Sequence, residues 1–303
     1  MVTPRYIPRE DFPRSPSRAE GMISLDVRTD NFEMNLIRDI KYIERDGAPL
    51  YVQLILPDGI TPRTPLVVYV TGSAFHWQNI PQTIPRLCLL ANKGAAVASV
   101  QYRGAEAAPF PAQVLDVKAA VRFIKGIAPR YGLNADNVFL MGDSSGGHTA
   151  LLGGITAGAE YEEDVYMEHS SAVRGIIDLY GVVDISRMND ELSAYDHTTA
   201  DCPAGLLIGG VTVPDHPELY EPTVVTRYIT PARELPPVLI LHGTNDETVP
   251  FGQSCILYER LRECGKRARF YAVEGAHHGG REFWAEQTLG IITDFLEENA
   301  VKA

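Results

Sequence analysis

The stretch from Val138 to His148 constrains the fold more than any other, because an apolar run leads directly into Gly142-Asp143-Ser144-Ser145-Gly146. A helix-permissive run of small residues follows, so the segment predicts a buried strand, a sharp turn and the start of a helix. In such a turn the glycines make room for crowded backbone, and the serine hydroxyl is exposed near the free N–H groups of the helix. The sequence therefore predicts Ser144 as a nucleophile. A phosphate-binding turn is a poor alternative, because no P-loop lysine follows.

Composition and charge limit the classes of protein that the chain can represent. It has 303 residues, of which 45% are hydrophobic and 22% charged, which is ordinary for a globular protein that could form one domain over residues 1–303. The net charge of −12 argues against binding to nucleic acid or to anionic membrane surfaces. The four cysteines form no C-x-x-C pair, which indicates reduced thiols. With neither a signal-peptide pattern nor a membrane-spanning run, we expect a cytoplasmic protein.

Strand and helix patterns alternate along the chain. Strands are expected over residues 35–43, 50–56, 65–70, 95–102, 138–141, 173–180, 236–241 and 268–273. Helices are expected over residues 84–92, 111–128, 149–155, 251–264 and 281–299. The first two strands form a hairpin, and the later alternation predicts an α/β fold with a mostly parallel central sheet and helices on both faces.

Two segments depart from this alternation. Residues 1–30 contain four prolines and few apolar clusters, and we expect an extended arm that lies on the body of the protein. From residue 182 to about residue 230 the periodicity is lost, and this segment is too long for a simple connection in a compact domain. We therefore expect residues 182–230 to form a small cap or lid insertion that sets substrate choice.

A serine nucleophile needs a base to take its proton and an acid to orient that base. Asp246 stands just after the strand that ends at Leu241, where such acids occur, and its neighbour Glu247 could be mistaken for it. His277 and His278 stand in a glycine-rich loop after the last strand. We expect one of the two histidines to be the base, and the other to line the site or to have no role in it.

The negative charge that develops on a substrate carbonyl oxygen also needs backbone donors. The loop after the strand over 65–70 and the residue after the nucleophile usually supply them. The sequence therefore predicts an oxyanion hole from the N–H groups of Ser73, Ala74 and Ser145. The adjacent Phe75, His76 and Trp77 could line an acyl pocket, or their rings could instead fill the core.

Several motifs together carry a family resemblance over residues 65–295. They are Gly142-Asp143-Ser144-Ser145-Gly146-Gly147-His148, Tyr102-Arg103, Phe110-Pro111-Ala112 leading to Asp116, His242-Gly243-x-x-Asp246-x-x-Val249-Pro250, and Gly275-Ala276-x-His278-Gly279. In these motifs the chain resembles the α/β-hydrolase superfamily, and within it the esterase and lipase group near the bifunctional acetylxylan and feruloyl esterases and the hormone-sensitive-lipase type. The resemblance implies an α/β-hydrolase fold and places the catalytic histidine on His278. The chain departs from the family at the oxyanion loop, where the usual His-Gly-Gly is Thr71-Gly72-Ser73.

The resemblance and the residues together predict a serine carboxylesterase with Ser144, His278 and Asp246 as its triad. Its substrates would be small-molecule or saccharide-linked esters, with feruloyl or other hydroxycinnamoyl esters and acetyl esters of plant polysaccharides as the groups to test. An arylformamidase, an amidase or a peptidase would use the same triad. A non-catalytic ligand-binding homologue would typically have lost a triad residue. We expect no cofactor and no metal, and a homodimer remains an open alternative to a monomer.

Overall fold

The computed structural model describes residues 7–26 and 33–301, and the chain forms two compact units, Met1–Asn31 and Phe32–Ala303. The described part of the first unit contains one short 3-10 helix, η1 (Arg9–Asp11), and its residues are almost all exposed. The predicted arm falls in this unit, although residues 1–6 and 27–30 lie outside the described residues. Its packing on the rest of the chain stays a prediction.

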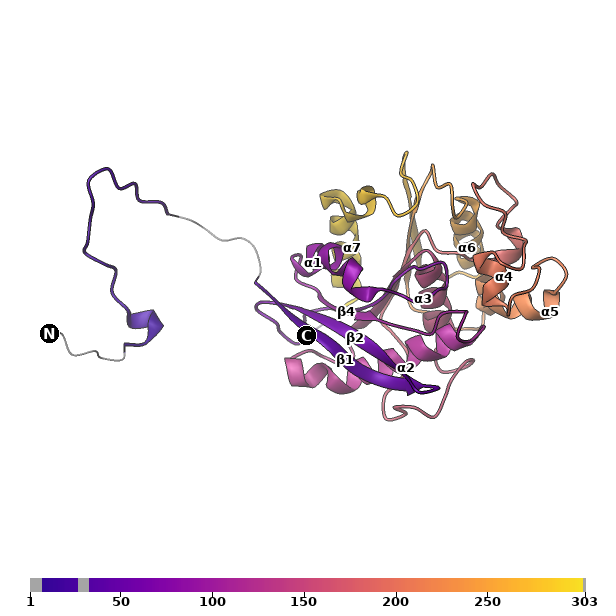
Figure 1. The fold of residues 1–303 in the computed structure, drawn as a ribbon, viewed down its shortest axis with the longest axis horizontal. Helices are drawn as coiled ribbons and strands as arrows, with labels where there is room; N and C mark the ends of the chain where they lie inside the picture. Colours follow the sequence, from indigo (N-terminus) through magenta and orange to yellow (C-terminus); the bar gives the residue numbers. More distant parts are fainter. Residues whose placement is uncertain (1–6, 27–32, 302–303) are drawn as a thin grey trace. The chain divides into compact units, whose positions relative to one another are not determined.

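An eight-stranded sheet, counted over the described residues, forms the centre of the second unit (Figure 1). Its strands are β1 (Met34–Arg45), β2 (Ala48–Pro57), β3 (Leu66–Val70), β4 (Ala96–Val100), β5 (Val138–Asp143), β6 (Ile176–Leu179), β7 (Val238–Gly243) and β8 (Ala268–Val273). The spatial order is β1-β2-β4-β3-β5-β6-β7-β8. β1 and β2 form the predicted antiparallel hairpin and β2 pairs antiparallel with β4, whereas all later pairs are parallel. The predicted α/β-hydrolase architecture is therefore confirmed.

Helices cover both faces of the sheet because its central strands are apolar on both sides. The helices are α1 (Ile84–Ala91), α2 (Ala112–Ile127), α3 (Ser145–Ile155), α6 (Gly252–Glu263) and α7 (Glu286–Asn299). One face carries α1 and α7, which pack on alternate residues such as Val67, Tyr69 and Phe139. The other face carries α2, α3 and α6, which pack on the intervening residues, such as Val68 and Leu140 (Figure 1).

The last predicted helix, residues 281–299, is not continuous, and the prediction is wrong in this respect. A 3-10 helix, η7 (Arg281–Trp284), is separated from α7 by Ala285, whose backbone is extended with ψ of 159°. The break lets Phe283 and Trp284 both be buried, whereas adjacent side chains of one α-helix point in directions about 100° apart. Packing of these two large rings therefore overrides the helical periodicity.

The segment over residues 182–230 contains short helical turns joined by irregular backbone. Such turns are too short to give the sequence a regular repeat of hydrophobic residues. They are η4 (Ile185–Arg187), α4 (Pro203–Leu207), α5 (Pro217–Tyr220), η5 (Glu221–Thr223) and η6 (Val225–Tyr228). Its apolar residues share a core with Phe75, Ala105 and Val249 of the loops beyond β3, β4 and β7. The cap segment is thus packed on loops at the carboxyl ends of the parallel strands.

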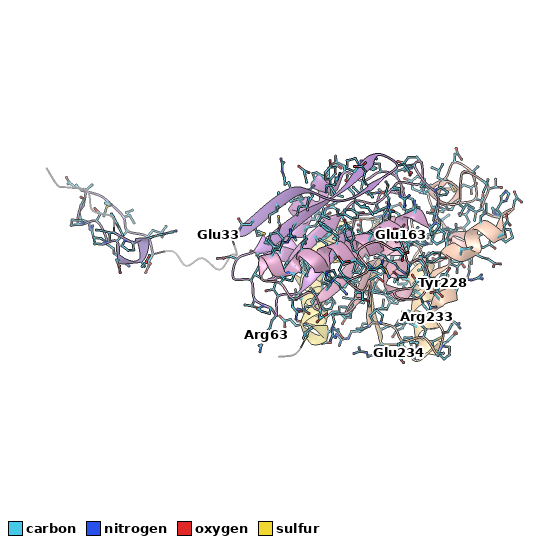
Figure 2. The ribbon with its side chains drawn as sticks, turned by 90° about the horizontal axis from the view of Figure 1, so that it is seen from below. Glu33, Arg63, Glu163, Tyr228, Arg233 and Glu234 are labelled. Carbon is cyan, nitrogen blue, oxygen red and sulfur yellow. The ribbon has the colours of Figure 1, made fainter. Side chains whose placement is uncertain are left out.

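Two polar contacts fix the cap segment to the body. In α3, His148 is buried and its Nε2 donates to the carbonyl oxygen of Thr223, at 2.9 Å. Burial lowers the pKa of His148 to about 4, so the ring is neutral at neutral pH. Five residues further along the segment, the ring centroid of Tyr228 lies 5.9 Å from the guanidinium of Arg233, which also bonds to Glu160. Tyr228 and Arg233 are both labelled in Figure 2.

A buried carboxylate joins the hairpin to the sheet and to α2. Asp116 is fully buried, and its Oδ1 accepts from Arg45 Nε at 2.8 Å. Its Oδ2 accepts from the Nε of Arg103 at 2.8 Å and from the backbone N–H of the same residue at 3.0 Å. Arg45 also pairs with Glu163, which is labelled in Figure 2. The motif residues Arg103 and Asp116 therefore hold the ends of β1 and β4 on α2.

We expect Asp116→Ala to lower the free energy of unfolding by about 3 kcal/mol, because it removes the carboxylate paired with the poorly solvated Arg103 and leaves Arg45 paired with Glu163 alone. Urea unfolding followed by circular dichroism measures this change. The exposed Asp201→Ala is the matched control, for which we expect a change within about 0.5 kcal/mol. A loss of less than 1 kcal/mol for Asp116→Ala would contradict the structural role of this cluster.

Candidate active site

Ser144 lies at the turn between β5 and α3, in a backbone conformation that side chains rarely adopt. Its φ is 52° and its ψ is −125°, so the residue is strained. Its backbone N–H donates to the carbonyl oxygen of Leu179 on β6 at 3.0 Å, which ties the turn to the neighbouring strand. The predicted strand, sharp turn and helix are all present at this point.

The glycines on both sides of Ser144 are required by the close approach of backbone to backbone. A Cβ on Gly142 would lie 2.3 Å from the carbonyl oxygen of Gly146. A Cβ on Gly146 would lie 2.1 Å from the carbonyl oxygen of Val70, at the end of β3. Real Cβ atoms essentially never come this close to another heavy atom, so any side chain here would force the turn and the loop after β3 apart.

Ser144, His278 and Asp246 are joined by a continuous chain of hydrogen bonds. The Nε2 of His278 lies 3.0 Å from the Oγ of Ser144. The Nδ1 of His278 lies 2.8 Å from Oδ2 of Asp246 and 3.0 Å from Oδ1. These distances are those of a serine nucleophile, a base that can take its proton and an acid that orients the base. Residues 134 positions apart in the sequence are thus brought into direct contact.

Asp246 is held as an ionised carboxylate. Its Oδ1 accepts from the backbone N–H groups of Thr248 at 2.9 Å and Val249 at 2.8 Å, and Oδ2 lies 3.3 Å from Nε2 of His242. Burial acts to raise the pKa of Asp246, but hydrogen bonds from His242 and His278 outweigh it and hold the pKa well below its usual range. A carboxylate that stays charged can orient the imidazole of His278 and stabilise its protonated form.

The two adjacent histidines have different partners. His278 contacts Asp246, whereas the Nδ1 of His277 lies 3.1 Å from Oε2 of Glu247. The side chain of His277 is 66% exposed and that of His278 is 19% exposed. Successive side chains of extended backbone point to opposite sides, so only one ring reaches Ser144. The geometry thus singles out His278 over His277 and Asp246 over Glu247.

The loop predicted to form the oxyanion hole lies beside the nucleophile. The N–H of Ser73 donates to the Oγ of Ser145 at 2.9 Å, so in this structure it is already engaged. Within residues 33–301 the N–H groups of Ala74 and Ser145 meet no acceptor. Ala74 and Phe75 have φ of 53° and 62°, a strained arrangement that turns the loop around the site. The oxyanion role of Ser73, Ala74 and Ser145 stays a prediction.

Two side chains to which the sequence reasoning gave no role hold this loop in place. Asp143, immediately before the nucleophile, accepts with Oδ1 from the hydroxyl of Tyr69 at 2.7 Å and from the N–H of Gly72 at 2.8 Å. The hydroxyl of Tyr102 donates to the carbonyl oxygen of Thr71 at 2.9 Å. The sequence offered one signal for these two residues, because each is a polar residue at the end of a strand near the nucleophile motif. Their hydrogen-bond partners, however, depend on the order of the strands in the sheet.

The three residues predicted as acyl-pocket walls lie in different places. Phe75 is only 2% exposed, and it belongs to the core that the cap segment shares with the body. It therefore fills the core, which was the alternative left open above. His76 and Trp77 are about half exposed, and Oε1 of Glu106 accepts from the backbone N–H of Trp77 at 2.8 Å. Contact of His76 or Trp77 with a substrate stays a prediction.

A third carboxyl group, missed by the sequence reasoning, lies beneath the turn. Asp178 on β6 is fully buried and pairs in register with Gly142 of β5. Its Oδ1 lies where side chains of Gly147 and Gly181 would be, 2.5 Å and 2.2 Å from their would-be Cβ atoms. Neither oxygen has a hydrogen-bond partner among the residues that the structure describes. Burial, reinforced by the charge of Asp143, raises the pKa of Asp178 to about 8, so the group is neutral at pH 7.

Over the described residues, no group of three or more histidine, cysteine or acidic side chains is arranged to hold a metal ion. No helix among the described residues combines the length and the apolar composition that crossing a bilayer would require.

The fold and the hydrogen-bonded Ser-His-Asp arrangement define the chain as an α/β hydrolase. The sequence model of one family, BD-FAE, matches residues 52–261. The chain belongs to the BD-FAE family.

Three known proteins show what the chain is similar to. The esterase LipC of Mycobacterium tuberculosis is 27% identical over 80% of this chain and 61% of LipC. A solved structure of a truncated carbohydrate esterase from gut microbiota matches with a TM-score of 0.79 and 25% identity, over 90% of this chain and 98% of that one. A bifunctional GH43-CE protein of Bacteroides eggerthii matches with a TM-score of 0.76 and 32% identity, over 91% of this chain and 39% of that one. The chain spans between about half and three-fifths of the length of the curated relatives it matches.

We expect His278→Ala to lower ester turnover by about three orders of magnitude or more, because Ser144 loses its base. His277→Ala is the matched control at the adjacent position, and we expect a loss of about tenfold or less, because its ring bonds to Glu247 and not to a triad residue. Steady-state kinetics with a soluble ester measure both. The reverse ranking would place the base at His277 and contradict the geometry described here.

We expect Asp178→Asn to change how stability depends on pH. The carboxyl is neutral in the native state up to about pH 8 but ionised above about pH 4 in the unfolded chain, so the native state binds the extra proton. Wild-type stability is therefore fully present below pH 4 and falls by up to about 1.4 kcal/mol per pH unit as the pH rises toward 8. The uncharged amide removes this loss. Urea unfolding from pH 4 to 9 measures how the free energy of unfolding depends on pH, and the exposed Asp201→Asn is the control. Parallel curves for wild type and Asp178→Asn would refute the prediction.

Proposed function

We propose that the protein is a serine carboxylesterase in which Ser144 is the nucleophile, His278 the base and Asp246 the orienting acid. The observation that carries this proposal is the 3.0 Å contact between Ser144 Oγ and His278 Nε2, continued by the 2.8 Å contact between His278 Nδ1 and Asp246. A serine hydroxyl is a weak nucleophile near neutral pH, and this arrangement supplies the missing proton acceptor. The family membership supports the same reaction class.

The reaction takes place in two halves. Ser144 Oγ attacks the ester carbonyl carbon while its proton passes to Nε2 of His278, and a tetrahedral intermediate forms. The intermediate collapses as the carbon–oxygen bond to the alcohol breaks and His278 returns the proton to the leaving alkoxide. A water molecule then attacks the acyl carbon and gives a proton to His278. The bond from that carbon to Ser144 Oγ breaks, His278 returns the proton to Oγ, and the acid is released. Asp246 remains ionised throughout and stabilises the imidazolium each time it forms.

The negative charge on the carbonyl oxygen would be met by the free N–H groups of Ala74 and Ser145. Ser145 is the first residue of α3, so the positive end of the helix dipole lies at the same position. Each donor of this kind is worth about 3 kcal/mol in the transition state. The N–H of Ser73 becomes a third donor only if the oxyanion displaces the Oγ of Ser145, 2.9 Å away.

For the substrate, we propose an ester of a saccharide with a short acyl group such as acetyl. Two of the structurally similar proteins are a carbohydrate esterase and a GH43-CE protein. Phe75, which follows Ala74 in the chain, is buried in the cap core and is therefore not available as a wall of an acyl pocket. A short acyl group needs no aromatic wall, whereas a hydroxycinnamoyl ring would need one.

A substrate panel tests this function. We expect faster hydrolysis of p-nitrophenyl acetate and acetylated xylan than of a feruloyl ester or an aryl formamide, and loss of all activity in Ser144→Ala. A fluorophosphonate should label Ser144 alone, as read by peptide mass mapping. Labelling of another residue, or full activity of Ser144→Ala, would overturn the assignment. A higher kcat/KM for the feruloyl ester or the formamide would overturn the substrate class while leaving the triad intact.

A further inference from the structure

The imidazole of His278 reaches Ser144 across the end of a strand that carries no triad residue. The strands stand in the order β5, β6, β7 and β8. Ser144 follows β5, whereas His278 belongs to the loop after β8, so the histidine extends past the ends of β7 and β6 to make its contact. The residue immediately after β6 is Tyr180, and its side chain lies where the imidazole passes.

Tyr180 is held firmly at this point. Its φ of 43° lies in the left-handed region, and a residue with a side chain keeps such a conformation only where its surroundings enforce it. Its backbone N–H donates to the carbonyl oxygen of Leu241 on β7 at 2.8 Å. The ring is 1% exposed, and its centroid lies 4.4 Å from that of the fully buried Phe283. The ring of Tyr180 is therefore a fixed surface.

This surface forms a wall for the catalytic imidazole. The ring centroids of Tyr180 and His278 are 4.9 Å apart and their planes meet at 67°, which is the edge-to-face arrangement that aromatic pairs favour. The hydroxyl of Tyr180 makes no hydrogen bond to any residue in the ranges 7–26 and 33–301. Tyr180 therefore acts on His278 through its ring and not through its hydroxyl.

The contact matters most when Ser144 no longer holds the histidine. In the free enzyme the imidazole is held at both nitrogens, by Ser144 Oγ at Nε2 and by Asp246 at Nδ1. Once Oγ is bonded to the acyl carbon it carries no proton and cannot donate to Nε2. Asp246 then holds the ring at one nitrogen only, whereas the contact with Tyr180 involves no atom of Ser144 and persists.

We propose that Tyr180 is a positioning residue that keeps the imidazole of His278 in place while the acyl-enzyme is hydrolysed. The proposal rests on the proposed function, because a covalent intermediate is what removes the contact with Ser144. Tyr180 takes part in no bond that forms or breaks: water gives its proton to Nε2 of His278, and the tyrosine ring limits the tilt of the imidazole. Loss of the ring would therefore slow deacylation more than acylation.

Stopped-flow kinetics of Tyr180→Leu with p-nitrophenyl acetate measure the two steps separately. We expect the deacylation rate constant to fall about tenfold to thirtyfold, because a small misplacement of a catalytic group costs this much. Acylation should stay within about threefold of wild type, because Ser144 still holds the imidazole and the nitrophenolate leaves without needing a proton. The amplitude of the nitrophenolate burst counts the active sites, so an unfolded fraction is not mistaken for a slow step.

Two variants serve as controls for loss of the aromatic ring. Tyr180→Phe keeps the ring and should keep both rate constants within about twofold of wild type. Phe139→Leu removes an equally buried ring that packs on Phe295, and it should leave both rate constants unchanged. If Tyr180→Leu does not fold, Tyr180→Met takes its place, because a flexible side chain fills an irregular space. Unchanged deacylation, or an equal loss in both steps, would overturn the proposal.

A spectroscopic measurement separates failure of this proposal from failure of the proposed function. Ser144→Ala removes the Oγ contact without any reaction, so His278 is held as in the acyl-enzyme. Proton NMR detects the Nδ1–H of His278 in its bond to Asp246, and the signal is assigned by its loss in His278→Ala. We expect Ser144→Ala to keep this signal, and adding Tyr180→Leu, but not Tyr180→Phe, to broaden or abolish it.

The two failures give different results. If wild type hydrolyses no ester but the NMR signal depends on the ring at position 180, the positioning contact stands and the esterase function fails. If p-nitrophenyl acetate is hydrolysed but Tyr180→Leu changes neither deacylation nor the NMR signal, the role of Tyr180 is wrong and the esterase function stands.

Discussion

The structure depends on one close approach of backbone to backbone, where the first turn of α3 lies against the end of β3. Gly146 touches the carbonyl oxygen of Val70 so closely that no Cβ fits between them. This contact places the free N–H groups of the helix next to the loop after β3 and forces Ser144 into a left-handed conformation with its side chain outward. The same contact brings the loop that carries Ala74 next to Ser145, so the candidate oxyanion donors come from both sides of it.

Three carboxyl groups near the turn differ in charge state because their surroundings differ. Asp246 accepts hydrogen bonds from two backbone N–H groups and faces two histidines, which outweigh the cost of burial and keep it ionised. Asp178 is buried more deeply and neither of its oxygens has a hydrogen-bond partner among the described residues, so burial wins and the group holds its proton. Asp143 lies between these cases, since burial raises its pKa while Tyr69 and Gly72 donate to it. His278 thus has one dominant charged partner, which fixes the orientation of its ring.

The cap segment is anchored on the loops that follow β3, β4 and β7. Its helices are too short to be stable alone, and they persist because they share a core with Phe75 and Val249. The same packing buries the ring of Phe75, and the N–H of Ala194 donates to the carbonyl oxygen of Glu247 in the acid loop. The proposed preference for a short acyl group follows from this burial of Phe75.

The succession of strands and helices along the chain and the position of Ser144 between a strand and a helix could be predicted from the amino-acid pattern, because hydrophobic periodicity and the glycine spacing are local properties of the chain. The motif also indicated His278, but His277 stands beside it and differs only in which way its ring points. That direction depends on the backbone of a loop packed against Glu247 and Asp246. The break at Ala285, the burial of Phe75 and the neutral state of Asp178 likewise came only with tertiary packing, because each depends on residues distant in sequence that occupy the same space.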